Sequence, residues 1–225
     1  AVSATSARPQ AQPPLELVES IPVETNLDNP DVRNTRDVWL EMISSAQHAL
    51  DIEQFYIANT RGEALDTIIT AIMQAAERGV SLRLIVDGRM YKTYPATADS
   101  LGRRPGITMR VIDFAKIAGG IQHAKFFIVD GRAVFLGSQN FDWRALAHIH
   151  ELGLRIHDEA AARAFAKVFE MDWALAGSGK PEADGSVAMP EPVPVPRWST
   201  SRRTWPSRRS TSRTAGPVLR TRGPT

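Results

Sequence analysis

Hydrophobic and polar positions alternate with two different periods along the chain, and this pattern predicts a succession of strands and helices. Short apolar or alternating runs predict strands, whereas apolar residues three to four positions apart predict helices with one buried face. The predicted strands are residues 15–22, 52–58, 81–88, 107–114, 124–130, 132–138 and 150–157. The predicted helices are residues 34–51, 62–79 and 158–176, with a helical turn near 96–101.

Polar residues at the ends of these segments support the assignments. Asn34 or Thr35 is the expected N-cap of the first helix, Asp37 lies in its first turn, and Gly79 follows the second helix at its C′ position. The pair of strands around Gly131 is expected to form a hairpin. Strands that alternate with helices predict an α/β sandwich with a mixed β-sheet and helices on both faces.

The pattern stops at both ends of the chain. Residues 1–14 are small, polar and proline-containing and are expected to form a disordered lead-in. Residues 177–225 are expected to form a linker followed by a disordered tail rich in Arg, Ser, Thr and Pro. One folded domain over residues 15–176 is therefore expected.

The net charge of +2 hides an uneven distribution. Residues 197–225 hold eight arginines and no acidic residue, so residues 1–196 carry +2 − 8 = −6. This acidic body weakens an argument for nucleic-acid binding from total charge. The arginine-rich tail could contact anionic lipid at a membrane surface, or nucleic acid, or remain without a specific partner.

Further features restrict the class of protein. The chain has no cysteine, which excludes disulfides and thiolate metal sites, and no apolar run approaches the ~18 residues of a membrane span. The composition of residues 1–14 fits the start of an exported protein, periplasmic or secreted, after removal of a signal peptide. An arbitrary chain boundary explains it equally well.

Residues 123–140, HAKFFIVDGRAVFLGSQN, concentrate reactive side chains around the predicted hairpin. The positions concerned are His123, Lys125, Asp130, Gly137, Ser138 and Asn140. His123 and Lys125 are two residues apart on an extended segment, so their side chains are expected on one face. An imidazole can act as a nucleophile, and an ammonium group beside it can neutralise the oxygens of an anionic group that it attacks. Ser138 and Asn140 could bind the same oxygens, so no metal is required.

The spacing H-x-K-x4-D-x6-G-S-x-N resembles the HKD motif of the phospholipase D superfamily. The stretches LVESIP, ALDIEQFYI and GSQNFDWRALAHIHELGL are similar to the branch with the mammalian endolysosomal phospholipase D-like proteins and the poxvirus envelope phospholipase. The resemblance covers roughly residues 15–180. It implies a phosphodiesterase that works without a cofactor through a phosphohistidine intermediate.

The resemblance also implies roles for two acidic residues. Family members carry a glutamate 28 residues after the motif histidine, which holds the second ring nitrogen, and Glu151 stands at this offset. Asp130 is implied to support the local architecture through ion pairs rather than to contact the phosphate. Gly137 belongs to the motif as a supporting position.

The chain lacks a second H-x-K sequence, although the mechanism of the family uses two histidines. A second copy of the chain could supply it about a two-fold axis. Alternatively, a second half has been lost, and the abrupt composition of the tail is what a GC-rich gene yields when read out of frame. The substrate could be a phospholipid or a single-stranded nucleic acid, cleaved by hydrolysis or transfer. A different hypothesis is a catalytically silent half-domain that binds phosphate or a partner.

Two other features have simpler interpretations. His148 and His150 form an H-x-H pattern that could bind metal, but ordinary strand positions are favoured because no third ligand is nearby. The stretch MYKTYP, residues 90–95, could line a substrate groove, and a surface loop is the favoured interpretation.

Overall fold

The computed structural model describes residues 14–178, so the predicted lead-in, tail and nearly all of the linker lie outside the described residues. The strands are β1 Leu15–Ser20, β2 Arg33–Asn34, β3 Ala49–Gln54, β4 Ile57–Ala58, β5 Ser81–Asp87, β6 Ile107–Ile112, β7 Lys125–Val129, β8 Ala133–Gly137, β9 Phe141–Asp142 and β10 Glu151–His157. The helices are α1 Thr35–Ser45, α2 Asp66–Glu77, α3 Gly88–Tyr91, α4 Pro95–Gly102, α5 Phe114–Ala118, α6 Trp143–Ala147 and α7 Glu159–Ser178.

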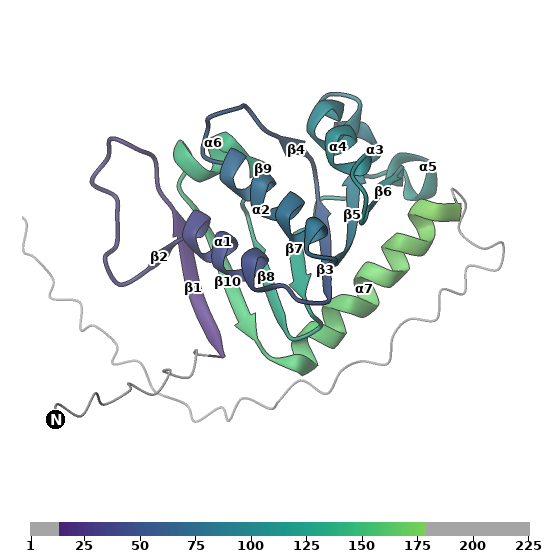
Figure 1. The fold of residues 1–225 in the computed structure, drawn as a ribbon. Coiled ribbons are helices and arrows are strands. Elements are labelled where there is room, and N and C mark those ends of the chain that lie inside the picture. Colours follow the sequence, from purple (N-terminus) through teal and green to yellow (C-terminus); the bar gives the residue numbers. More distant parts are fainter. Residues whose placement is uncertain (1–13, 179–225) are drawn as a thin grey trace, which may run out of the picture. The chain divides into compact units, whose positions relative to one another are not determined.

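An eight-stranded mixed sheet forms the centre of this region, in the order β2-β1-β10-β8-β7-β3-β5-β6 (Figure 1). Strands β3, β5 and β6 are parallel, whereas β3, β7, β8, β10 and β1 pair antiparallel in that succession. The short strands β4 and β9 form a separate parallel pair. This topology confirms the predicted mixed α/β fold.

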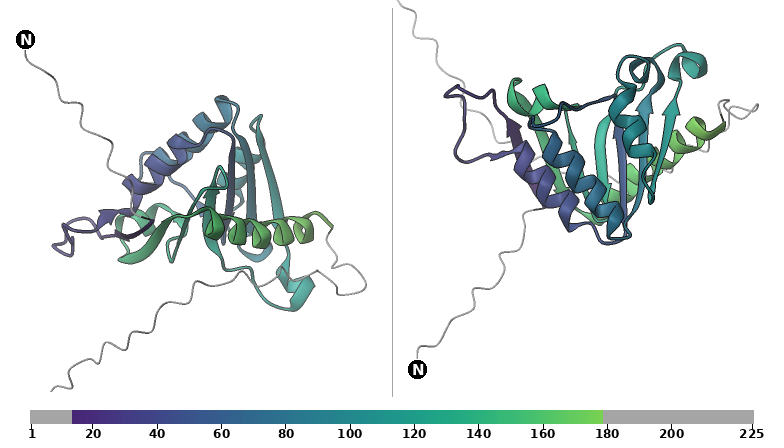
Figure 2. Two further views of the ribbon diagram at one scale, coloured as in Figure 1. Left: turned by 90° about the horizontal axis from the view of Figure 1, so that it is seen from below. Right: turned by 45° about the horizontal axis from the view of Figure 1, so that its top comes forward.

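Helices cover both faces of the sheet, as predicted. Helices α1 and α2 lie on one face and α7 on the other (Figure 2). Trp39 of α1 packs edge-on against Phe127 and Phe135 in the larger core. On the other face, Phe126 packs against Phe165 of α7 in the smaller core. The side chains of β7 enter the two cores alternately, because successive side chains point to opposite sides of a strand.

The first helix is shorter than its apolar period predicts. Asn34 caps it, as expected, but α1 ends at Ser45 and β3 already begins at Ala49. The cause is distant in sequence: the carboxylate of Asp130 accepts hydrogen bonds from the backbone N–H groups of Gln47, His48 and Ala49. These amides bind the carboxylate instead of continuing the helix.

The last helix is longer than predicted and continues through Gly177 to Ser178. A side chain at Gly177 would begin 2.5 Å from Nη1 of Arg110, which donates to the carbonyl oxygen of Trp173 at 2.7 Å. The glycine therefore leaves space for an arginine that ties α7 to β6.

The aspartate–glycine pairs at 87–88 and 130–131 adopt different structures. Asp130 and Gly131 both have positive φ, 51° and 64°, as a type I′ hairpin turn requires. Asp87 instead caps α3, because its carboxylate accepts from the backbone N–H groups of Arg89 and Met90. Residues 88–91 are thus helical rather than part of a turn and loop.

Candidate functional site

The C-terminal ends of β1, β3 and β8 and the N-terminal ends of β7 and β10 lie at one edge of the sheet, the upper edge in Figure 1. Gln54 at the end of β3 is paired with Lys125 at the start of β7. Gly137 at the end of β8 faces Gly153, and Ser20 at the end of β1 faces Glu151. The antiparallel pairings bring the start of one strand beside the end of the next, so residues of the motif gather at this edge.

His123 and Lys125 are in direct contact. The ammonium of Lys125 lies 3.2 Å from each ring nitrogen of His123 and donates to its carbonyl oxygen at 2.9 Å. Lys125 is buried at the start of β7, whereas His123 lies in the preceding loop with an exposed side chain. The two side chains meet, but His123 lies outside the strand on which both were expected.

The charge states of this pair suit a nucleophile beside a cation. Partial burial and the neighbouring ammonium of Lys125 lower the pKa of His123, against the opposing charge of Asp87. The imidazole is therefore neutral at neutral pH, which is the nucleophilic form. Burial lowers the pKa of Lys125, and the carboxylate of Glu151 opposes this change.

Gln122 fixes the backbone next to His123, a role that the motif did not indicate. Its N–H donates to Asp87 at 2.9 Å, and its side-chain oxygen accepts from Ala124 N–H at 3.0 Å. Its side-chain amide donates to Glu53, which is completely buried. Burial is the main cause that raises the pKa of Glu53 to about 9, and the nearby carboxyl group of Asp172 adds to it. The carboxyl group of Glu53 is therefore protonated at neutral pH.

The segment after β8 carries Ser138 and Asn140. Ser138 is exposed, and its hydroxyl lies within hydrogen-bonding reach of Glu151 and of Leu152 O, 3.4 Å away. The side-chain oxygen of Asn140 is buried and has no hydrogen-bond partner among the described residues. These two residues follow the strand rather than extending it, so the predicted two-residue alternation does not decide their direction.

Gly137 holds this segment close to β10. A Cβ at Gly137 would lie 2.1 Å from Oε1 of Gln139, 2.9 Å from Gly153 Cα and 3.0 Å from Leu152 O. The completely buried amide of Gln139 fills this space and donates to Thr35 at 3.0 Å. Glycine at position 137 is therefore a packing requirement, because any side chain there would displace Gln139 or separate β8 from β10.

Glu151 is brought near Lys125 and Ser138 but makes no hydrogen bond with His123 in the described part of the chain. Burial raises the pKa of Glu151, whereas Ser138 and Lys125 act in the opposite direction. One of its carboxylate oxygens is buried without a hydrogen-bond partner in the same region. The predicted orientation of the His123 ring by Glu151 stays a prediction.

Asp130 lies at the opposite end of β7 from His123. Burial acts to raise the pKa of Asp130, but hydrogen bonds from the N–H groups of Ala49, His48 and Gln47 outweigh it and lower the pKa. The contacts are therefore with backbone amides rather than the ion pairs that the resemblance implied. Five residues of extended chain separate Asp130 from the site, on the order of 17 Å.

The other sequence features also have definite positions. His148 ends α6, and His150 lies just before β10, 3.2 Å from the carboxylate of Glu19, so neither occupies the strand position that was expected. In residues 14–178 no three His, Asp or Glu side chains are grouped so that they could hold a metal ion. No helix in this range combines the length and apolar character of a membrane span.

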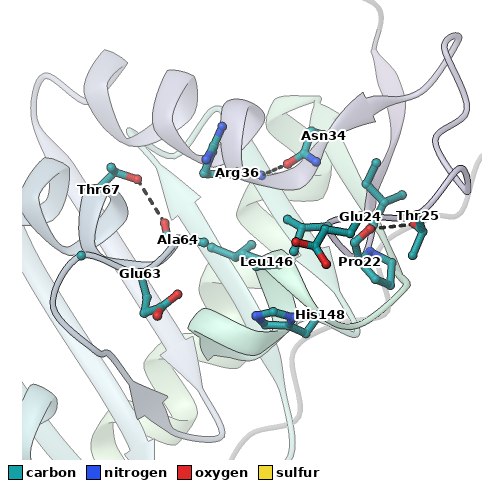
Figure 3. Close-up of a pocket in the computed structure, with 14 residues that line it drawn as sticks. Pro22, Glu24, Thr25, Asn34, Arg36, Glu63, Ala64, Thr67, Leu146 and His148 are labelled. Atoms are coloured by element: carbon teal, nitrogen blue, oxygen red, sulfur yellow. Dashed lines mark hydrogen bonds between the residues drawn. The ribbon is translucent and has the colours of Figure 1, made fainter.

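The cavity shown in Figure 3 lies elsewhere on the molecule and has a volume of about 770 Å³. Its lining includes Glu24, Glu63, Arg36 and His148. Two carboxylates against one guanidinium make it a poor environment for an anionic phosphate. None of the motif residues lines it, so we do not assign phosphate chemistry to this cavity.

Comparisons with known proteins identify the class to which this fold and motif belong. The protein-family description "Cardiolipin synthase, PLD-like domain" matches residues 39–173, more than half of the chain. The fold and this match define a PLD-like domain of the α/β class. The chain belongs to the phospholipase D superfamily.

The relatives that the chain resembles differ in the activity that their names state. The chain is 35% identical over 150 residues to "Phospholipase D Z" of Dictyostelium discoideum, covering 62% of this chain and 35% of that one. It is 31% identical over 175 residues to "5'-3' exonuclease PLD3" of Bos taurus, covering 72% and 36%. It is 32% identical over 169 residues to the "Virion nicking-joining enzyme" of Vaccinia virus, covering 73% and 39%. The chain thus spans little more than a third of the length of these relatives.

Solved structures share the fold. Nuc from Salmonella typhimurium, a phospholipase D family member, superimposes with a TM-score of 0.55 at 23% identity, covering 72% of this chain and 94% of that one. NucT from Helicobacter pylori has a TM-score of 0.55 at 22% identity, covering 61% and 86%.

Proposed function

We propose that this chain supplies one half of a metal-independent phosphodiesterase site in which His123 is the nucleophile. The observation that carries the proposal is the contact between His123 and the buried Lys125 ammonium at the strand edge where Ser138 also lies. A neutral imidazole beside a fixed cation suits attack on a phosphodiester, whose negative charge the cation stabilises.

The proposed reaction has two steps. A ring nitrogen of His123 attacks phosphorus, the bond to the leaving oxygen breaks, and a second histidine donates a proton to that oxygen. Water or an acceptor alcohol then attacks the phosphohistidine, the P–N bond breaks, and the second histidine removes the proton. Lys125, Ser138 and Asn140 bind the non-bridging oxygens in this scheme.

The second histidine must come from outside the single motif. A second copy of the chain could supply it, or a further half of a longer protein. The match to the curated relatives covers little more than a third of their length, which is compatible with a further half. The names of the relatives include both phospholipases and nucleases. A silent half-domain that binds phosphate is the alternative if no second histidine reaches the site.

The test combines turnover, oligomeric state and trapping of the intermediate. The full chain is assayed with a chromogenic phosphodiester, with and without EDTA, after size-exclusion chromatography. We expect EDTA-insensitive turnover in a dimeric fraction, loss of it in His123→Ala, and a phosphoramidate on His123 after a rapid alkaline quench. A monomer that binds phosphate without turnover would support the silent half-domain, and turnover that survives His123→Ala would refute the role of His123.

A further inference from the structure

A strip of aromatic rings leads away from His123 along the same edge of the sheet. The ring of Phe55 contacts the imidazole of His123 with centroids 4.5 Å apart, and the ring of Tyr56 lies 5.7 Å from Phe55. Tyr94 stacks on Tyr56 at 4.9 Å with an angle of 22° between the planes. All three aromatic side chains are partly exposed, so they are not simply part of the core.

The strip ends at a cavity of about 330 Å³, which we call the aromatic cavity. Tyr94, Trp143 and Arg144 line it, together with residues 57–60 and 93–97. These segments belong to β4, the start of α4 and the start of α6, at the upper edge in Figure 1. The volume is at the lower end of the range of ligand pockets, about 300–1,000 Å³.

A charged hydrogen-bond network holds the cavity wall in place. Asp142 is buried and accepts from the Tyr56 hydroxyl at 2.9 Å. It also binds Arg144 through two hydrogen bonds of 2.9 and 2.6 Å. The guanidinium carbon of Arg144 lies 5.5 Å from the ring of Trp143. The wall is therefore preorganised, and a ligand that enters it need not order these side chains.

The chemistry of the lining selects among ligands that a phosphodiesterase could take. An acyl chain would leave the buried side-chain oxygen of Asn59, which has no hydrogen-bond partner among the described residues, without a donor, and this is unfavourable. A cationic headgroup would meet no carboxylate among the lining residues, and the nearby Asp142 is already bound to Arg144 and Tyr56. A nucleobase suits the site because its π-face stacks on aromatic rings and guanidinium planes, and an N–H group at its edge can donate to the side-chain oxygen of Asn59.

We propose that the aromatic cavity binds a nucleobase of a single-stranded nucleic acid whose phosphodiester lies at His123, and that Tyr94, Trp143 and Arg144 determine this preference. The inference rests on the proposed function and names its substrate class. The strand must be single, because a base inside a duplex is paired and stacked and cannot enter a pocket without being flipped out.

The first experiment measures the preference of the chain for a strand with bases over a strand without them. The full chain is assayed on a single-stranded DNA oligonucleotide and on an abasic strand of equal length, and the ratio of the two kcat/KM values is the readout. Loss of one stacked ring costs about 5- to 150-fold in that ratio, which is the expected decrease for Tyr94→Leu and for Trp143→Leu. Tyr94→Phe, which keeps the ring, is expected to retain most of the preference.

Phosphatidylglycerol vesicles provide the competing substrate, and thermal unfolding confirms that each variant is folded. If Tyr94→Leu lowers lipid cleavage as much as oligonucleotide cleavage, or leaves the ratio unchanged while folded, the proposal is overturned. Trp143→Phe provides a second ring-conserving variant if a leucine variant does not fold.

A binding measurement separates this proposal from the proposed function. Fluorescence anisotropy of both labelled strands is recorded with His123→Asn, which should bind without turnover. Tighter binding of the base-containing strand, lost in the double variant with Tyr94→Leu, supports the aromatic cavity even if the wild-type chain cleaves no diester. Equal binding of the two strands overturns it even if the chain is an active phosphodiesterase.

Discussion

The ammonium of Lys125 lies 3.2 Å from both ring nitrogens of His123, although the Lys125 side chain is buried. A cation held this close disfavours a proton on the imidazole, so it lowers the pKa of His123 together with partial burial. The same cation is positioned to stabilise charge on a phosphate bound to the ring. One contact thus serves both the protonation state of the nucleophile and the binding of its target.

Replacing Lys125 by methionine should separate these effects. In Lys125→Met we expect the pKa of His123 to rise, because the nearby positive charge is lost, and turnover to fall by about 10²–10³-fold or more. NMR titration of the His123 ring and steady-state assays measure the two changes. Lys167→Met, on the exposed surface of α7, is the matched control. An unchanged pKa of His123 in Lys125→Met would contradict the electrostatic role.

Adding one methyl group at Gly137 should disrupt the segment that carries Ser138. The new Cβ would lie 2.1 Å from Gln139 Oε1 and 2.9 Å from the backbone of Gly153, so the strands or the buried amide must move. Gly137→Ala is expected to lower the free energy of unfolding by about 1–3 kcal/mol and to reduce turnover. Urea unfolding and the diester assay check this expectation.

The control for this variant is Gly120→Ala. A Cβ at Gly120 would meet no atom within 4 Å, and its φ is not in the left-handed region. We expect stability close to that of the wild type. Equal effects of the two glycine substitutions would show that the tight contact at Gly137 has no energetic consequence.

Asp130 should matter for stability rather than for chemistry. Asp130→Asn removes the charge that three backbone N–H groups bind, and about 1–3 kcal/mol of stability should be lost at neutral pH. Asparagine tolerates the positive φ at this position, so the hairpin turn should persist. Turnover per folded molecule should stay within a few-fold of the wild type, whereas a loss as large as that of Lys125→Met would assign Asp130 a catalytic part.

The effect of Asp130 should also depend on pH. Because its folded-state pKa is lowered, its contribution is present above the unfolded pKa of about 3.9 and disappears as pH falls through the folded pKa. The difference in unfolding free energy between wild type and Asp130→Asn should therefore shrink in acid. Asp28→Asn, at an exposed position, is the matched control for the charge change.

The buried carboxyl of Glu53 predicts the opposite pH dependence. Its pKa is raised to about 9 by burial and by Asp172 of α7, so the folded state holds a proton that the unfolded state releases above about pH 4.3. Its contribution to stability is complete below that unfolded pKa and is lost as pH rises toward 9. Wild-type stability should fall between pH 5 and pH 8, by up to about 4 kcal/mol from this group.

Glu53→Gln keeps the shape and removes the proton equilibrium. The variant should show a flatter pH profile and exceed the wild type in stability at pH 8, because the amide can still accept from Gln122. Urea unfolding at pH 5 and pH 8 measures the difference. Parallel pH profiles for the two proteins would mean that Glu53 is ionised in the folded state.

The sequence determined the local structure and the chemistry of the motif. Apolar periodicity located the main strands and helices, Asn34 marked the start of α1, and the H-x-K spacing identified the family and the pair of side chains that meet. These features depend on residues close together in the chain. Local propensity and apolar periodicity are sufficient to predict the elements, and the spacing of the motif is sufficient to recognise the family.

Only the tertiary structure decided the features that join distant segments. Asp130 ends α1 from more than 80 residues away, Gln139 fills a space that exists only when Gly137 faces Gly153, and Tyr94 reaches the strip that begins at His123. Each depends on which strands become neighbours. That choice is set by the burial of two cores on opposite faces of one sheet, a property of the whole chain that no short stretch of sequence contains.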